Sequence, residues 1–180
     1  MSGSFGDSTD LRPRLDALAS EREALLNRLT AIPTDRLRAR PDASTWSVLQ
    51  IVEHLIQAEE YCLLGHLPAD HLEHRRRTLL QRLAYEAVVL ILRSPIRVST
   101  PVEDMDPRGT ATLEELADRW RTSQSRLREI TLDVPDPRRD AVFRHPVAGP
   151  MTPAQAIRML AAHQTRHIRQ IDARLSNSPE

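Results

Sequence analysis

The amino-acid sequence predicts an all-α fold, and three observations lead to this prediction. Apolar residues, mostly leucine, recur every three or four positions with charged residues between them, which is the pattern of amphipathic helices. Serine or threonine followed three residues later by glutamine or glutamate marks helix starts, because the two side chains can cap free backbone N–H groups. Prolines separate the helical segments. We therefore expect helices and no convincing strand.

The chain length of 180 residues fits one domain with its own core. We expect a flexible N-terminal tail over residues 1–10, a helical domain over 11–175 and a C-terminal tail over 176–180. The short connections between several of the helices favour antiparallel neighbours, as in a helical bundle.

The first helix is predicted over residues 11–29, where leucines follow helical spacing. Two prolines bracket residues 33–41, which we interpret as a connecting loop. Ser47 and Gln50 form a capping box at the start of the second helix, which is expected to run to about Gly65.

A third helix is expected over residues 71–92. Residues 94–109 contain three prolines and are interpreted as an extended surface loop or the mouth of a site. Thr112 with Glu115 begins a further helix that continues through Ile130.

The last helix is predicted to begin after Thr152 as its N-cap and to continue to about Leu175. Pro153 takes the first helical position, where the missing N–H costs no hydrogen bond. Five helical segments result.

The composition excludes several classes of function. The 25 basic residues balance the 25 acidic ones, so no overall charge attracts nucleic acid or an anionic membrane. Every basic residue is arginine, which excludes a Schiff-base lysine. The single cysteine excludes an internal disulfide. The longest apolar run is too short to cross a bilayer, and a cytoplasmic location is the expectation.

Three histidines are the candidate site residues. His163 and His167 are four residues apart, so both imidazoles lie on one helix face. That face adjoins the apolar stripe of the last helix, and His54 lies among apolar residues of its own helix. Inward-facing imidazoles need partners. Either a shared cation supplies the partner, or each ring is a neutral histidine at the core edge that hydrogen-bonds a neighbour.

The residues around the histidines narrow the chemistry. Gln164 stands where the HExxH helix of a metalloprotease has its catalytic glutamate, so that peptidase activity is disfavoured. No glutamate stands three residues before any of the three histidines, so the pattern of di-iron carboxylate bundles is missing. A mononuclear site is indicated. Nitrogen ligands suit zinc, nickel, copper or iron better than magnesium or calcium.

Three segments together resemble the DinB-like superfamily, which includes metal-dependent thiol transferases. They are Trp46 to Leu55 with the Trp-Ser helix start, His145 to Thr152 before the last helix, and His163 to Ile171 with HxxxH and Gln-Ile. The resemblance implies an up-and-down four-helix bundle with an additional short helix or long loop. It also implies that His54, His163 and His167 hold a divalent metal with water positions open, and that the chain forms a homodimer.

The leading functional hypothesis is an enzyme that activates a low-molecular-weight thiol at this metal, in the manner of an S-transferase acting on a small molecule. Zinc or nickel is the favoured ion. Gln50 and Gln170 are candidates for orienting imidazoles, with an exposed helix residue or a cap as the alternative. Arg166 is a candidate for meeting an anionic substrate, with a surface salt bridge as the alternative. The alternatives are a hydrolase that uses metal-bound hydroxide, and a non-catalytic, stress-related metal-binding dimer.

Overall fold

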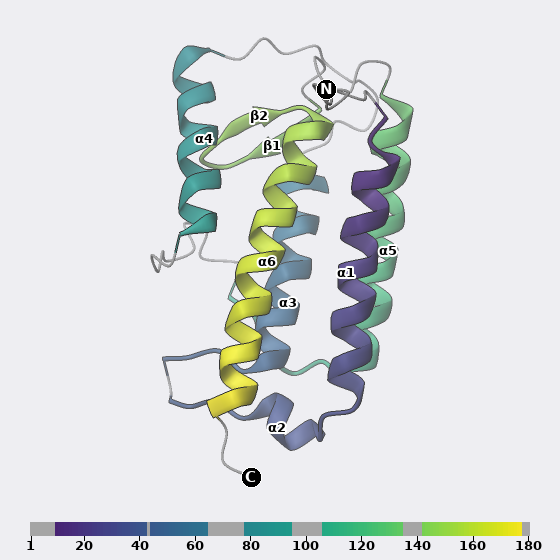
Figure 1. Ribbon diagram of the computed structural model, residues 1–180, viewed down its shortest axis with the longest axis vertical. Coiled ribbons are helices and arrows are strands. Elements are labelled where there is room, and N and C mark those ends of the chain that lie inside the picture. Colours follow the sequence, from purple (N-terminus) through teal and green to yellow (C-terminus); the bar gives the residue numbers. More distant parts are fainter. Residues whose placement is uncertain (1–9, 43, 65–77, 95–105, 135–141, 178–180) are drawn as a thin grey trace, which may run out of the picture.

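The computed structural model describes residues 10–42, 44–64, 78–94, 106–134 and 142–177 (Figure 1). Its elements, in chain order, are α1 (Arg12–Thr30), α2 (Thr34–Arg38), α3 (Val48–Glu59), the π-helical turn η1 (Glu60–Leu64), α4 (Leu79–Arg93), α5 (Leu113–Asp133), β1 (Phe143–His145), β2 (Gly149–Met151) and α6 (Pro153–Asn177). The predicted all-α class is confirmed.

Four long helices, α1, α3, α5 and α6, form the bundle; α3 and α5 run in the same direction, and α1 and α6 run opposite to them (Figure 1). Helix α4 lies outside this bundle, where it packs against α6 and against β2. The expected four-helix bundle with an additional element is therefore present, but the strict up-and-down alternation expected for it is not, because α3 and α5 are parallel. None of the described helices is both long enough and apolar enough to cross a membrane.

The capping signals place most helix ends correctly. Ser47 Oγ accepts a hydrogen bond from Gln50 N, and Gln50 Oε1 accepts one from Ser47 N, as the capping box requires. The same reciprocal bonds begin α5 at Thr112. Thr152 and Gln155 make them at the start of α6.

Three sequence predictions need correction. The region 33–41 is not only a loop, since it contains the short helix α2. Helix α4 begins at Leu79 and not at residue 71, because Thr78 has extended backbone angles and caps the helix through Gln81; residues 71–77 lie outside the described part.

The third correction is an unexpected hairpin, in which β1 pairs antiparallel with β2. The ring atom Nδ1 of His145 accepts hydrogen bonds from Val147 N and Ala148 N and so closes the turn. Gly149 has a φ of +69°, a backbone conformation that residues with a Cβ rarely adopt. Three-residue strands are too short to show alternation in the sequence.

The bundle interior consists of two apolar clusters with a polar layer between them. One cluster includes Leu18 and Leu127, and the other includes Leu25 and Trp120. The polar layer takes one residue from each helix of the bundle. Its members are Arg22, Glu59, Ser123 and Gln164, all at most 4% exposed.

Each member of this layer has a partner from another helix. The Arg22 guanidinium donates to Glu59 Oε2 and, at 3.0 Å, to Gln164 Oε1. Ser123 Oγ donates to Glu59 Oε1 at 2.7 Å. The Arg22 guanidinium also lies 5.4 Å from the ring centroid of Trp120. Hydrogen bonding thus compensates two buried charges that would otherwise be very unfavourable.

Replacing one partner of the Arg22–Glu59 pair should destabilise the fold strongly. In an Arg22→Met variant the Glu59 carboxylate stays buried without its cation, so we expect the free energy of unfolding to fall by about 3–5 kcal/mol. Urea denaturation measures this loss. The double variant Arg22→Met, Glu59→Leu removes both charges and should recover most of it.

The matched control is Arg28→Met, because Arg28 lies on the same helix as Arg22 and pairs with Asp172 of α6, but both side chains of this pair are 47% exposed. We expect this change to cost at most about 1 kcal/mol. Equal losses for Arg22→Met and Arg28→Met would show that the buried layer contributes no special stability.

Candidate metal centre

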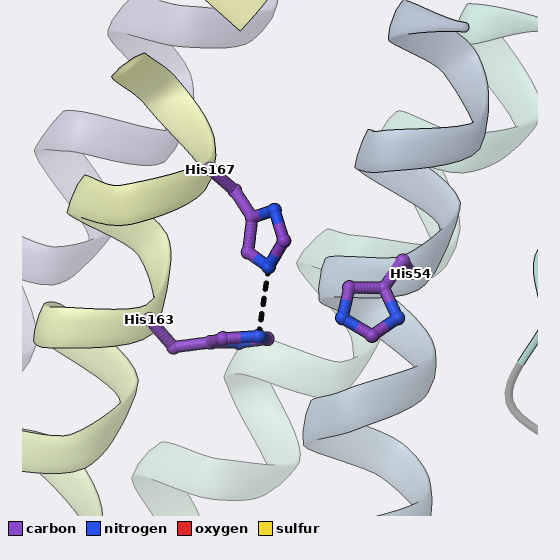
Figure 2. Close-up of side chains that lie close together, drawn as sticks. All are labelled: His54, His163 and His167. Atoms are coloured by element: carbon purple, nitrogen blue, oxygen red, sulfur yellow. Dashed lines mark hydrogen bonds between the residues drawn. The ribbon is translucent and has the colours of Figure 1, made fainter. Parts of the chain in front are cut away.

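Two antiparallel helices of the bundle bring the three histidines together. His54 projects from the middle of α3, while His163 and His167 project from α6 one turn apart, and all three rings point toward one another (Figure 2). The Nε2 atoms of His163 and His167 are 3.0 Å apart. The centroid of the His54 ring lies 5.3 Å from that of His163 and 4.9 Å from that of His167.

The histidine cluster is largely shielded from solvent. His54 and His167 are buried, and His163 is half-buried. The ring of Trp46, which precedes the cap of α3, lies 4.7 Å from the ring of His54 by centroid. An indole at this distance keeps water from one side of the imidazole.

Gln170 determines which nitrogen of His167 carries the proton. Its Oε1 atom lies 2.8 Å from His167 Nδ1 and can only accept, so Nδ1 must donate. His167 Nε2 then carries no proton, and its lone pair faces the other histidines of the cluster. Gln50, the other glutamine considered from the sequence, caps α3 and donates to the carbonyl oxygen of Pro107 instead.

Burial and the neighbouring histidines keep the rings of His163 and His167 neutral. Burial lowers the pKa of His163 well below its ordinary value, and the neighbouring His167 and His54 lower it further. The pKa of His167 is lowered to about 3, chiefly by burial and then by His54. Neutral imidazoles are the form in which histidine binds metals.

The donor set fits one divalent transition metal. The three histidines each offer a ring nitrogen, and these atoms all lie within 4.8 Å of one another. Two nitrogens about 2.1 Å from a common zinc ion are separated by roughly 3.0–3.4 Å, which agrees with the contact between His163 and His167. Within the described residues, no carboxylate belongs to this group. Zinc and nickel accept such nitrogen ligands, whereas magnesium and calcium require oxygen.

The family relationship agrees with this geometry. A family model described as the DinB superfamily matches residues 17–171, which include all three histidines. The chain belongs to the DinB superfamily. No curated protein and no solved structure gives a significant match. For this DinB chain, the resemblance inferred from the sequence is therefore confirmed, together with its helical fold.

Two residues near the site have contacts that the sequence did not indicate. His145 closes the hairpin turn, and it lies near enough to His163 to lower the pKa of that ring. Arg166 donates to the carbonyl oxygens of Ile91 and Ser94 at the end of α4. In this arrangement, Arg166 links α6 to the end of α4 in the DinB fold.

A groove of about 700 Å³ lies between α1, α4 and α6, and its lining includes Leu18, Leu92 and Arg169. None of the three histidines lines it. The groove is therefore separate from the histidine cluster.

Metal binding should depend on each histidine of the cluster. We expect one divalent ion per chain in the purified protein and its loss in His54→Ala, His163→Ala and His167→Ala, because two remaining nitrogens hold the ion too weakly. Elemental analysis after dialysis measures the content. A Gln170→Ala variant should keep one site but with affinity reduced about 10–100-fold.

Thr165→Ala is the matched control for metal content, because Thr165 is exposed on the same helix. The Thr165→Ala variant should keep one ion per chain and the wild-type affinity for that ion. Full metal content in all three histidine variants would show that the ion binds elsewhere.

The metal-free protein should lose stability in acid. In the unfolded chain the histidines bind protons below a pKa of about 6.5, whereas folded His167 binds one only near pH 3. The unfolded state therefore gains protons first, and the free energy of unfolding falls as pH decreases, by about 1.4 kcal/mol per pH unit for each such histidine.

This slope is measured by denaturing chelator-treated protein at several pH values between about 7 and 5. His167→Gln should make the slope shallower by about one proton. An unchanged slope would contradict the burial of a neutral ring at this position.

Proposed function

We propose that this chain is a divalent-metal-dependent enzyme that activates a low-molecular-weight thiol and transfers it to a small molecule. The observation that supports this proposal is the convergence of three imidazoles with no carboxylate in their group, among the residues described. Burial keeps two of these rings, His163 and His167, neutral. Zinc or nickel is the ion that suits these ligands.

Each residue of the centre has a defined task in this proposal. His54, His163 and His167 hold the ion through ring nitrogens. Gln170 keeps the proton of His167 on Nδ1, so that Nε2 stays available. Trp46 shields His54 and reduces the local dielectric, which strengthens any electrostatic effect at the site.

When bound, the ion supplies a positive charge that lowers the pKa of a thiol beside it and favours the nucleophilic thiolate. Sulfur then forms a bond to the electrophilic carbon of the second substrate as the leaving group departs, and the thiol proton passes to solvent. The chain's contribution is to hold three neutral ligands, which leave a net positive charge at the site.

The hydrolase alternative is less well supported, because it needs a general base. Within the described part of the chain, the group around the histidines contains no aspartate or glutamate. An ester or amide hydrolase of this kind would therefore lack a carboxylate to accept the proton from water.

The test uses zinc- or nickel-loaded protein with a panel of small thiols, including glutathione, cysteine and coenzyme A, and a thiol-reactive fluorogenic electrophile such as monochlorobimane. We expect conjugation with at least one thiol and a loss of roughly a hundredfold or more in His54→Ala, since the charge that ionises the thiol is lost. Thr165→Ala is again the control, with unchanged activity expected.

A second arm supplies nitrophenyl esters without thiol. Hydrolysis that depends on His54, without thiol conjugation, would favour the hydrolase instead. Metal-loaded protein that turns over neither class of substrate would overturn the enzyme proposal and favour a non-catalytic metal-binding protein.

A further inference from the structure

The groove between α1, α4 and α6 combines an apolar floor with a rim of arginines. Its volume of about 700 Å³ falls within the range of about 300–1,000 Å³ that is usual for small-molecule sites. Leu18 and Ile157, which are 4% and 2% exposed, form its floor and belong to an apolar cluster of the bundle. Ala17 and Ala161 line it with short side chains, so space remains above the floor. On α6 the lining extends from Ile157 to Arg169, about 18 Å of helix, so the groove is elongated.

The lining of the groove carries an excess of positive charge. Its only carboxylate is that of Glu21, whose Oε2 atom accepts a hydrogen bond from Gln164 Nε2 at 3.0 Å. The whole chain has a formal net charge of +0, so the excess is local. A concave site with charge of one sign favours a ligand of the opposite sign. The lining contains five arginines, which are Arg14, Arg93, Arg158, Arg166 and Arg169.

These arginines differ in whether they have partners within the chain. Arg158 donates to a carboxylate of α4 through two hydrogen bonds, and Arg166 donates to carbonyl oxygens at the end of α4. By contrast, the exposed guanidinium groups of Arg14, Arg93 and Arg169 make no ion pair or hydrogen bond with the part of the chain that the structure describes. Their donors remain available to a ligand.

Arg93 and Arg169 belong to the same end of the groove. Arg166 joins the last residues of α4 to α6, because it donates to the carbonyl oxygens of Ile91 and Ser94. Arg93 lies between those two residues in α4, and Arg169 follows Arg166 by about one turn of α6. Since Arg166 already compensates the carbonyl groups at the end of α4, their partial negative charge does not oppose an anion there.

We propose that this groove binds a free aliphatic carboxylate, with the carboxylate group between Arg93 and Arg169 and the aliphatic chain along the floor. A guanidinium can donate two parallel hydrogen bonds to the two oxygens of a carboxylate, which makes arginine well suited to this group. An aliphatic chain is slender enough to enter the groove, whereas the flat surface of a bilayer does not reach residues as buried as Leu18 and Ile157. The site is independent of the proposed function, because none of the three histidines lines the groove.

Isothermal titration calorimetry of the full chain with sodium decanoate, kept below its critical micelle concentration, tests this site. The wild type should bind one decanoate per chain. Decanol has the same aliphatic chain without the charge and should bind at least about tenfold more weakly. Arg93→Gln and Arg169→Gln should each raise the Kd for decanoate roughly tenfold, because each removes charged donors from the carboxylate. Both arginines are exposed, so the variants should stay folded, which circular dichroism checks.

The apolar part of the site has its own variant. Ala17→Phe places a large side chain in the groove from an exposed position of α1, and it should weaken the binding of decanoate about tenfold or more without changing any charge.

Three controls make the result specific. Arg126→Gln changes an exposed arginine of α5 outside the lining and should leave the Kd unchanged. Leu80→Gln removes a leucine of α4 that is 76% exposed outside the groove, and it should also bind as the wild type does. Chelator-treated protein should bind decanoate equally well, whereas a carboxylate held at the histidine cluster would require the ion.

Failure of the wild type to bind decanoate would overturn the proposal, whatever the thiol assays show. Binding that neither Arg93→Gln nor Arg169→Gln weakens would overturn it as well. Equal affinity for decanol would show that the charge is not recognised, and equal affinity for inorganic phosphate would show that the chain is not. Binding to phosphatidylglycerol vesicles in place of decanoate would assign the arginines to a membrane surface instead.

Discussion

The buried pair of Arg22 and Glu59 is the interaction on which the arrangement of the bundle depends. Apolar side chains pack in many registers, but a buried arginine and a buried carboxylate are tolerated only where they meet. Because Ser123 and Gln164 bind the same pair, all four bundle helices are aligned at one level. A shift of α1 or α3 by one turn would leave a charge without its partner, and a shift of α5 or α6 would remove a hydrogen bond from the buried pair.

This alignment also places the histidine cluster. Gln164 points into the polar layer, while His163 and His167 lie on a different face of the same helix and meet His54. Glu59 and His54 are likewise separated by little more than one turn of α3. The layer that fixes the register of α3 against α6 therefore fixes the distance between the ligands contributed by these two helices. Preorganised ligands of this kind reduce the ordering needed when an ion binds.

Much of the fold was predictable because its signals are local. Capping at Ser47, Thr112 and Thr152 depends on residues three positions apart, and HxxxH places two imidazoles on one face wherever the helix lies. The capping box of Thr78 and Gln81 was equally visible in the sequence, but the helix was expected to begin at residue 71.

The remaining features depend on distant residues. The position of Arg22 continues the apolar spacing of Leu18 and Leu25, which indicates that it faces the core, yet its partners lie on three other helices and no local pattern identifies them. The approach of His54 to the other two histidines is likewise a tertiary contact. It was predicted from the resemblance to the family and not from a local pattern.

The attachment of α4 links its surface to the helix that carries two of the histidines. Arg158 binds Glu86 near one end of the contact, and Arg166 binds the final carbonyl oxygens of α4 near the other. Arg166 stands between His163 and His167 in the sequence, so the same turns of α6 hold both the cluster and α4. Carbonyl groups at a helix end attract a cation, and a guanidinium with several donors can satisfy two of them at once. Helix α6 is therefore held from two sides, by the polar layer within the bundle and by α4 outside it. This restraint keeps the face of α6 that carries His163 and His167 directed toward His54.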